Sequence, residues 1–184
     1  MRKGVLSNVK IVELMKGDVS SVELKYRYVT SSYYDLSILR RDESWKVELT
    51  LKPLEKPLEK GFEDKLFADH VEEPRVYAAV LAGQQVGWVE LGYHGWNNRM
   101  RLWEFLVKEE FRRVGIGSLL MQCAVKVAKE KRARMLVLET QSCNVPAINF
   151  YLKHGFSLIG FDVAAYSNED VEKKEVRLEF GLAL

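Results

Sequence analysis

FRRVGIGS, residues 111–118, is a glycine-bearing loop that follows an apolar run and opens a helical pattern. Gly115 and Gly117 permit a tight turn in which backbone N–H groups point at a bound anion. The N-terminus of the following helix adds a partial positive charge. Arg112 and Arg113 are close enough in sequence to add charge-assisted hydrogen bonds. The loop therefore predicts a cradle for a pyrophosphate.

The same loop has a simpler interpretation, which is a glycine-containing turn before a helix. It is not a P-loop, because no Gly-Lys-Ser/Thr follows it. It also lacks the third glycine of the dinucleotide-binding fingerprint. The loop alone leaves both interpretations open.

The second half of the chain predicts alternating strands and helices. A helix is expected over residues 116–131, because one face of it is apolar at Ile116, Leu120, Cys123 and Val127. A second helix is expected at residues 145–154, ended by Gly155. The remaining apolar runs have strand length and strand periodicity, at residues 76–81, 86–93, 100–108, 135–140, 156–163 and 175–180. This order predicts a mixed α/β fold with the helices confined to the second half.

The first half shows weaker patterns. Alternating apolar residues predict strands at residues 22–28 and 45–51. The polar stretch 31–42 predicts a connection with a short strand at 36–39. Two prolines in residues 52–57 predict a break in regular structure, since proline lacks the backbone N–H. Residues that follow, 61–71, fit either a short helix or an acidic loop.

Composition and charge argue against several classes of protein. The chain has 28 basic and 26 acidic residues, a near-balance that argues against a nucleic-acid partner. Its apolar runs are far shorter than the roughly 20 residues that span a bilayer, so we expect no membrane partner. The start at Met1 to Gly4 is basic, but no secretory signal fits the residues that follow. Cys123 and Cys143 match no metal-ligand spacing, so we expect free thiols, no metal and a cytoplasmic location.

Two motifs carry a resemblance to a known family. The first is the Arg-x-x-Gly-x-Gly of the loop. The second is Asn-x-x-Ala-x-x-Phe-Tyr followed by Gly-Phe, with Asn144, Ala147, Phe150, Tyr151, Gly155 and Phe156. Residues 75–180 thereby resemble the GNAT superfamily of acetyltransferases. The resemblance implies the GNAT acyl-CoA N-acyltransferase fold, a mostly antiparallel sheet with a splayed pair of central strands and flanking helices.

Within that superfamily the chain is most similar to the streptothricin acetyltransferase branch. The further matching residues are Glu90-Leu91, Trp96-Asn97, Leu138 to Gln141, Lys153, Gly160, Asp162, Tyr166 to Asn168 and Glu175. The first 70 residues match the branch poorly. The resemblance implies one GNAT domain over residues 1–184, with N-terminal strands and an acceptor-side segment at 1–74 and an acetyl-CoA-binding core at 75–184.

The resemblance implies acetyl-CoA as the acetyl donor. The strand before the loop would carry a bulge, and the pantetheine arm would pair with the backbone of Phe105, Leu106 and Val107. A backbone N–H near Leu106 would polarise the acetyl carbonyl, and Asn144 would hold the arm from the opposite strand. The pyrophosphate would lie against Arg112, Arg113, Val114, Gly115, Ile116, Gly117 and Ser118.

Three residues are candidates for proton transfer. Tyr151 stands where the family places a general acid, although an aromatic residue in a helix is commonly a packing residue. An ammonium group with a pKa of about 10.4 must lose a proton before it attacks. Glu104 is the first candidate for this base and Glu139 the second, and either carboxylate could instead be salt-bridged or exposed.

Acidic and aromatic residues suggest the acceptor. The acidic residues other than Glu104 and Glu139 that attract attention are Glu63, Asp64, Asp69, Glu72, Glu73, Glu90, Asp162, Glu169 and Asp170. If several of them line the acceptor cleft, the substrate is cationic; otherwise they form a solvated surface. The residues expected to bind the acceptor are Glu90, Tyr93, Trp96, Asn97, Asp162 and Tyr166. We interpret His70, His94 and His154 as surface or capping residues, with His94 a remote alternative base.

Three functions remain open at this point. The first is N-acetylation of a primary amine on a cationic small molecule, such as a streptothricin-like antibiotic, by direct attack in a ternary complex. The second is acetylation of a protein N-terminus or lysine. The third is a non-catalytic domain that binds acyl-CoA. A homodimer is expected, because two-fold dimers are the commonest oligomers.

Overall fold

The computed structural model describes residues 6–19 and 22–184, so the basic start at Met1 to Gly4 lies outside the described residues. The chain divides into two compact units. Unit 1 consists of Met1–Tyr26, Phe62–Leu138 and Leu182–Leu184, and unit 2 consists of Arg27–Gly61 and Glu139–Gly181. Both units draw on both halves of the sequence, so neither follows the expected division at residues 74 and 75. The single domain over 1–184 stays a prediction.

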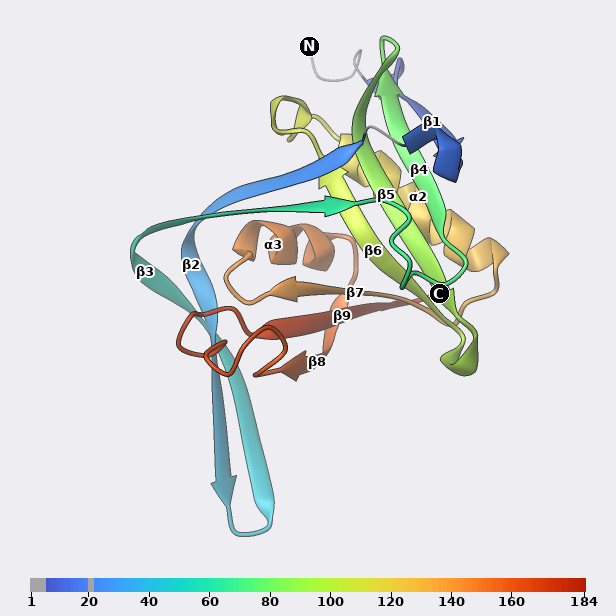
Figure 1. Cartoon of the computed structure of the whole chain (residues 1–184). Coiled ribbons are helices and arrows are strands. Elements are labelled where there is room, and N and C mark those ends of the chain that lie inside the picture. The colour runs from blue at the N-terminus through green and yellow to red at the C-terminus, as the bar shows by residue number, and fades with distance from the viewer. Residues whose placement is uncertain (1–5, 20–21) are drawn as a thin grey trace. The chain divides into compact units, whose positions relative to one another are not determined.

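Unit 1 is built on a sheet with the strand order β1-β4-β5-β6-β7. All neighbours are antiparallel except β6 and β7, which are parallel. Figure 1 shows β4, β5 and β6 side by side, with β1 beside β4. The strands are β1 (Lys10–Leu14), β4 (Arg75–Leu81), β5 (Gln84–His94), β6 (Arg99–Val107) and β7 (Met135–Gln141). The predicted strands of this region are confirmed, whereas β1 was not predicted.

The helix α2 (Ile116–Glu130) covers one face of this sheet. Three of the four predicted core positions on its apolar face, Ile116, Leu120 and Val127, are buried, while Cys123 is only partly buried. A Cβ atom at Gly87 of β5 would lie 3.1 Å from the Leu120 side chain. The glycine therefore lets the helix approach the sheet closely.

The opposite face of the sheet is covered by segments from the first half of the chain. Because side chains alternate along a strand, Trp88 lies on the other side of β5 from Gly87. Its apolar cluster contains Leu14, Leu24, Leu66, Val76, Ala78, Trp88 and Leu106, with Tyr26 and Phe67 packed at the margin. This face carries the candidate acceptor side of the site described below.

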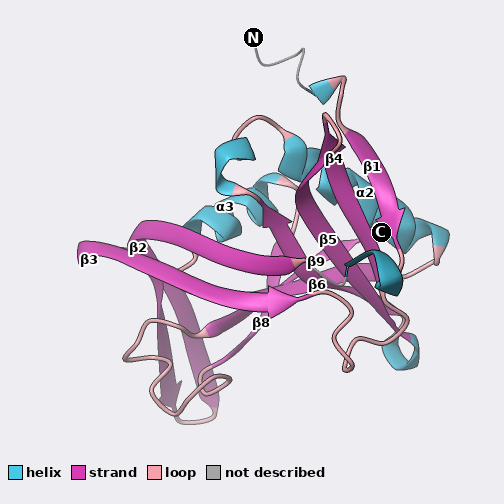
Figure 2. Ribbon diagram, turned by 45° about the horizontal axis from the view of Figure 1, so that its top comes forward, coloured by secondary structure: helices cyan, strands magenta, loops and turns pink. Residues whose placement is uncertain are grey.

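The strands β2 (Glu23–Arg41) and β3 (Ser44–Lys65) form a two-stranded ribbon, visible in Figure 2. The prediction of a connection at residues 31–42 is wrong, since β2 continues through it. The prediction of a break at 52–57 is also wrong, because Pro53 and Pro57 lie within β3. Each strand of a two-stranded ribbon has one unpaired edge, where a missing N–H costs no ladder hydrogen bond.

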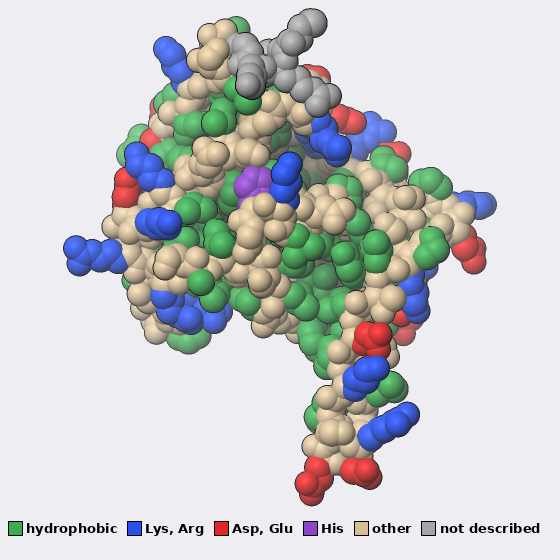
Figure 3. All heavy atoms as spheres, turned by 180° about the vertical axis from the view of Figure 1, so that it is seen from behind, with side chains coloured by type: hydrophobic (Ala, Val, Ile, Leu, Met, Phe, Trp, Pro, Cys, Tyr) green, Lys and Arg blue, Asp and Glu red, His purple; other side chains and the backbone are tan. Residues whose placement is uncertain are grey.

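Beyond β3 the chain runs through irregular structure to β4, so the helix considered for residues 61–71 does not form. Figure 3 shows acidic and basic side chains gathered at the end of the β2–β3 hairpin, where the turn is made. Two short 3-10 helices, η2 (Gly95–Asn97) and η3 (Glu109–Phe111), flank β6, and a third, η1 (Lys16–Val19), follows β1.

Unit 2 also contains the helix α3 (Val145–Lys153) and the antiparallel pair β8 (Ser157–Asp162) and β9 (Arg177–Ala183), whose last residues belong to unit 1. The helix ends as predicted before Gly155, which has a φ of +85°. Within the described residues, no helix is both long and apolar enough to cross a membrane. Cys123 and Cys143 are both free thiols, as expected.

Candidate active site

A bulge in β6 organises the candidate site. Glu104 is paired with Glu90 of β5, whereas the next rung pairs Leu102 with Leu91, so Trp103 is the extra residue on β6. Such a bulge bends the strand and redirects the side chains around it. The bulge implied by the family resemblance is therefore present, directly before Glu104.

Beyond the bulge, every second backbone N–H of β6 points away from β5. The N–H of Lys108 donates to Val86 of β5, and alternation places the N–H of Leu106 on the same side. The N–H of Phe105 points the other way, toward the side on which β7 pairs only with Arg99 to Arg101. The amides that can meet a ligand at this edge are thus those of Phe105 and Val107 rather than that of Leu106, and Phe105 is the one beside the bulge.

Glu104 is held by a tyrosine from β2. The Tyr26 hydroxyl donates to Glu104 Oε2 at 2.5 Å and accepts from the Phe105 N–H at 3.2 Å. The Tyr26 ring stacks on Phe62, with ring centroids 4.5 Å apart and an angle of 10° between the planes. All these residues belong to unit 1.

Two further carboxylates lie close to Glu104. Glu90 is fully buried and accepts from the Phe67 N–H at 2.8 Å through Oε1. Within the described part of the chain, its Oε2 has no hydrogen-bond partner. Asp64 acts on both glutamates through its charge. Three acidic residues predicted from the sequence therefore come together here.

Burial makes these glutamates weak acids. Burial raises the pKa of Glu104 to about 8; the Tyr26 hydrogen bond lowers it, and the charges of Asp64 and Glu90 raise it. Burial likewise raises the pKa of Glu90 to about 7, opposed by the Phe67 N–H and reinforced by Asp64. A base is most effective when its pKa lies near the working pH, so Glu104 is suited to accept a proton near neutrality.

The loop at residues 111–118 has the conformation of an anion cradle. Arg113 has a φ of +64° and Gly115 a φ of +105°, and Gly115 is the N-cap of α2. Within the described residues, no side chain forms an N-cap hydrogen bond at this helix. Its first N–H groups therefore lack the side-chain acceptor that a capping residue supplies. Arg112 Nε donates to Val107 O at 2.9 Å, which ties the loop to the end of β6. The Leu6 side chain packs against Gly115, so a pyrophosphate at this turn would have to displace that contact.

Unit 2 contains the other residues assigned to the donor. Tyr151 lies on α3, is 8% exposed, and packs against Phe150, Phe156 and Phe180. Asn144 is the N-cap of α3, and its side chain accepts from the Ala147 N–H at 3.3 Å. The side chain of Asn144 thus stabilises the start of the helix that carries Tyr151.

Glu139 has a different environment from Glu104. It forms an ion pair with Arg177 at 3.5 Å and lies 3.5 Å from the Tyr166 hydroxyl. Burial raises the pKa of this tyrosine well above its usual value. Asp162 is exposed, and its side chain accepts from the Ala164 N–H. Glu139 is therefore a salt-bridged residue, which is one of the two environments expected for it from the sequence.

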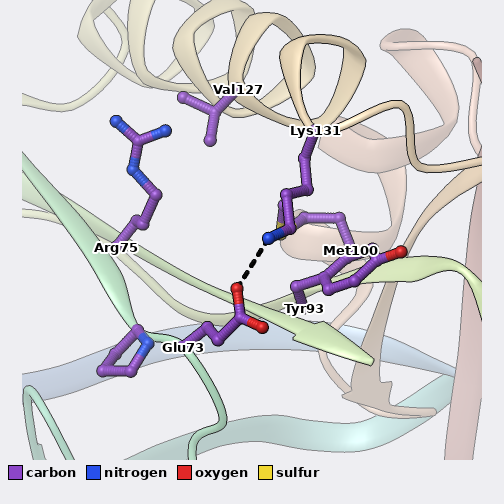
Figure 4. A pocket seen from close by; sticks show the side chains of 7 residues that line it. Glu73, Arg75, Tyr93, Met100, Val127 and Lys131 are labelled. Carbon is purple, nitrogen blue, oxygen red and sulfur yellow. Dashed lines mark hydrogen bonds and ion pairs between the residues drawn. The ribbon is translucent and has the colours of Figure 1, made fainter. Parts of the chain in front are cut away.

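Three predicted acceptor residues lie apart from Glu104. Tyr93 is on the α2 face of β5, because Glu90 and Gly92 occupy the other face. It lines a pocket of about 340 Å³ (Figure 4), whose wall includes the Lys131–Glu73 ion pair at 2.7 Å. Trp96 is 86% exposed, and Asn97 accepts from Arg134 through its backbone oxygen. Of the predicted acceptor residues in unit 1, only Glu90 joins the carboxylate cluster.

The histidines do not form a cluster around the carboxylates. His70 and His94 both contact the ring of Trp103, and His154 Nδ1 lies 2.8 Å from Phe150 O at the end of α3. The expected capping role of His154 is confirmed. Among residues 6–19 and 22–184, no group of three or more His, Cys, Asp and Glu side chains is arranged to hold a metal ion.

The sequence analysis missed Tyr26 and Phe62 as site residues. Tyr26 was assigned only to an alternating strand, and its contact with Glu104 spans 78 positions in sequence. No local pattern predicts such a contact. The aromatic ring of Phe62 directly before the acidic residues 63–64 was a signal for Phe62 alone.

The site thus consists of a bulged strand, a glycine loop and a helix that begins at Gly115. A model of the acetyltransferase (GNAT) family matches residues 40–156, more than half of the chain. The chain belongs to the GNAT family. The predicted fold is confirmed, and this GNAT protein is an acetyl-CoA-dependent N-acetyltransferase.

Three known proteins are similar to this GNAT protein along most of its length. Streptothricin acetyltransferase of Streptomyces lavendulae is 31% identical over 159 residues, which cover 82% of each chain. The crystal structure of nourseothricin acetyltransferase has a TM-score of 0.76 and 28% identity, covering 96% of this chain and 98% of that one. A Bacillus anthracis protein of the streptothricin acetyltransferase class, solved with acetyl coenzyme A, has a TM-score of 0.72 and 26% identity, covering 96% and 97%.

Proposed function

We propose that this enzyme transfers the acetyl group of acetyl-CoA to a primary amine of a cationic small molecule of the streptothricin class. The observation that carries the proposal is the partly buried Glu104, held at the bulge of β6 beside an outward-facing N–H and across from Glu90. The similarity to streptothricin acetyltransferases over most of the chain supports the acceptor class.

Glu104 is the proposed base. A primary ammonium with a pKa of about 10.4 must lose a proton before its nitrogen can attack. A carboxylate whose pKa is about 8 takes that proton more readily than one near 4.5. Glu139 remains the alternative, but its carboxylate is already engaged in an ion pair with Arg177.

The transfer itself is a direct substitution in a ternary complex. Glu104 accepts one proton from the ammonium group, and the neutral nitrogen then attacks the acetyl carbon and forms the new C–N bond. The nitrogen releases its second proton to solvent as the amide forms. The Phe105 N–H stabilises the negative charge that develops on the acetyl oxygen. The C–S bond then breaks, and Tyr151 is proposed to return a proton to the sulfur of CoA.

Donor binding is assigned to the loop and the edge of β6. The backbone N–H groups of residues 113–118 and the dipole of α2 are proposed to hold the pyrophosphate. The backbone of Phe105 and Val107 is proposed to pair with the pantetheine arm as an added strand would. We expect acetyl-CoA to bind with a dissociation constant on the order of micromolar.

The carboxylates favour a cationic acceptor. Asp64, Glu90 and Glu104 give this face of unit 1 a negative potential whenever at least one is ionised, and a buried negative charge is stabilised by an ammonium group. A neutral amine would gain less from the same surroundings. Acetylation of a protein N-terminus or lysine and non-catalytic acyl-CoA binding are both less favoured, because streptothricin and nourseothricin acetyltransferases are similar to the chain over most of its length.

The test is an assay of thiol release from acetyl-CoA with a panel of amines. We expect rapid release with streptothricin and slow release with a peptide bearing a free N-terminus or a lysine. Glu104→Gln should reduce turnover by about 10²- to 10⁴-fold. Glu130→Gln, which removes a carboxylate paired with Lys126 at the end of α2, is the matched control and should have no effect. Faster turnover of either peptide than of streptothricin would contradict the proposal.

A further inference from the structure

The hydroxyl of Tyr26 occupies the position where the acetyl oxygen of the donor is expected. The Phe105 N–H is the amide of β6 that follows the bulge and faces the unpaired edge, and it donates to the Tyr26 hydroxyl. The proposed function requires the same N–H for the acetyl oxygen. Both oxygens cannot accept this N–H at full strength, so the donor must compete with Tyr26.

The two hydrogen bonds of the Tyr26 hydroxyl differ in length. Its bond to Glu104 Oε2 measures 2.5 Å, whereas the Phe105 N–H donates to it over 3.2 Å. An N–H···O bond of 3.2 Å is at the long end of the usual range, and bonds to a carboxylate are the stronger class. Loss of the Phe105 bond is therefore the smaller change, and the Glu104 bond is the one expected to persist.

The ring of Tyr26 is fixed from two sides. It stacks on Phe62 and lies at the margin of the apolar cluster that contains Leu24 and Leu106. An offset or stacked aromatic pair adds to the energy of burial and restricts the ring. The hydroxyl is thus held at one place, where it can orient the carboxylate of Glu104.

We infer that Tyr26 is a positioning residue of the acetyl transfer, whose hydroxyl orients Glu104 and yields the Phe105 N–H to the acetyl oxygen of the incoming donor. The inference rests on the proposed function of Glu104 and Phe105. Before the donor binds, Tyr26 satisfies the N–H and keeps the carboxylate oriented. After the donor binds, the Phe105 N–H donates to the acetyl oxygen instead of to the Tyr26 hydroxyl. The Tyr26 hydroxyl continues to donate to Glu104.

This arrangement also affects when Glu104 is ionised. The groups that face it are the Tyr26 hydroxyl from β2, Asp64 from β3 and Glu90 from β5. The Tyr26 hydrogen bond favours the ionised carboxylate, while the two acidic neighbours oppose it. Removal of the hydroxyl should therefore raise the pH at which Glu104 becomes a base.

The experiment compares Tyr26→Phe with the wild-type enzyme in two measurements. Calorimetric titration gives the dissociation constants of acetyl-CoA and of CoA, and we expect the preference for acetyl-CoA over CoA to rise about threefold to tenfold in the variant. The pH dependence of kcat/KM with streptothricin gives the acid limb, which should move up by about one pH unit. CoA lacks the acetyl oxygen, so its own affinity should stay unchanged.

Tyr28→Phe is the matched control. Tyr28 lies two residues after Tyr26 on β2. Its hydroxyl donates to Gln141 and contacts Cys143, not Glu104. This control should change neither measurement. A thermal melt of each variant confirms that it is folded.

Each outcome distinguishes the inference from the proposed function. If the wild-type enzyme binds CoA and acetylates streptothricin but Tyr26→Phe leaves either the acetyl-CoA preference or the acid limb unchanged, the inference is wrong and the proposed function stands. A uniform loss of turnover at every pH, with no change in preference, shows a structural role for Tyr26 and also overturns the inference. If the wild-type enzyme binds no CoA, the proposed function fails first.

Discussion

Glu104 of β6 lies directly opposite Glu90 of β5, so a partly buried and a fully buried carboxyl group share one rung of an antiparallel ladder. Side chains on such a rung are close neighbours, and like charges there repel each other. The first consequence concerns the pH dependence of the reaction. Since Glu104 must be ionised to act as a base and its pKa is about 8, kcat/KM should rise about tenfold per pH unit below pH 8 and level off above it.

This pH profile is measured with the wild-type enzyme and a cationic acceptor between pH 5.5 and about 9.5, below the pKa of the acceptor's ammonium groups. In Glu104→Gln the limb should disappear together with most of the activity. A profile that already levels off near pH 5 would show that Glu104 is not the base.

The second prediction concerns Glu90→Gln. Glutamine retains an oxygen for the Phe67 N–H but removes the negative charge opposite Glu104. We expect the acid limb of kcat/KM to move to lower pH by a few tenths of a unit up to about one unit. Movement in the opposite direction would contradict the coupling between the two carboxyl groups, and Glu130→Gln should leave the limb in place.

The third prediction concerns stability. The pKa of Glu104 is about 8 in the folded protein and near 4.5 when unfolded, so the folded state retains a proton that the unfolded state loses between these values. The wild-type protein therefore loses stability as the pH rises from about 4.5 to 8. Glu104→Gln has no such cost, and between pH 4 and pH 8.5 we expect it to gain up to about 5 kcal/mol relative to the wild-type protein, or on the order of 10 °C in Tm.

The measurement is a pair of thermal melts across this pH range. A difference in Tm between the variant and the wild-type protein that stays constant from pH 4 to pH 8.5 would show that Glu104 is not a weak acid in the folded state.

The fourth prediction concerns Tyr151→Phe. Phenylalanine preserves the packing of the ring against Phe150, Phe156 and Phe180 but removes the hydroxyl. If Tyr151 returns the proton to the sulfur of CoA, kcat should fall at least tenfold while the dissociation constant of acetyl-CoA changes less than about threefold. Equal turnover in the variant would remove Tyr151 from the mechanism.

The elements of the second half could be predicted because their patterns are local. The spacing of Ile116, Leu120 and Val127 predicts a helical face. A glycine after a helical pattern, such as Gly155, predicts the left-handed residue that ends α3. The β2–β3 ribbon could not be predicted in the same way. Prolines such as Pro53 and Pro57 normally exclude a strand that is paired on both sides. Strand β3 has only β2 as its partner in this ribbon, and the sequence does not show how many neighbours a strand has.

The site was predicted as far as its residues belong to motifs. Glu104 follows from its place before the loop, but its environment depends on Tyr26 and Asp64, which approach from distant parts of the sequence. Tyr93 shows that a motif match does not tell on which face of a strand a side chain lies. Two-residue alternation from Glu90 places it on the face covered by α2, away from the carboxylates.

The central claim is that residues 113–118 hold the pyrophosphate of acetyl-CoA and that the acetyl group reaches the Phe105 N–H beside Glu104. A crystal structure of the protein with acetyl-CoA bound tests it most directly. We predict phosphate oxygens within hydrogen-bond distance of the N–H groups at the start of α2, and the acetyl oxygen within about 3.2 Å of Phe105 N. A complex in which that loop contacts no phosphate, or in which the acetyl group lies away from β6, would contradict the account.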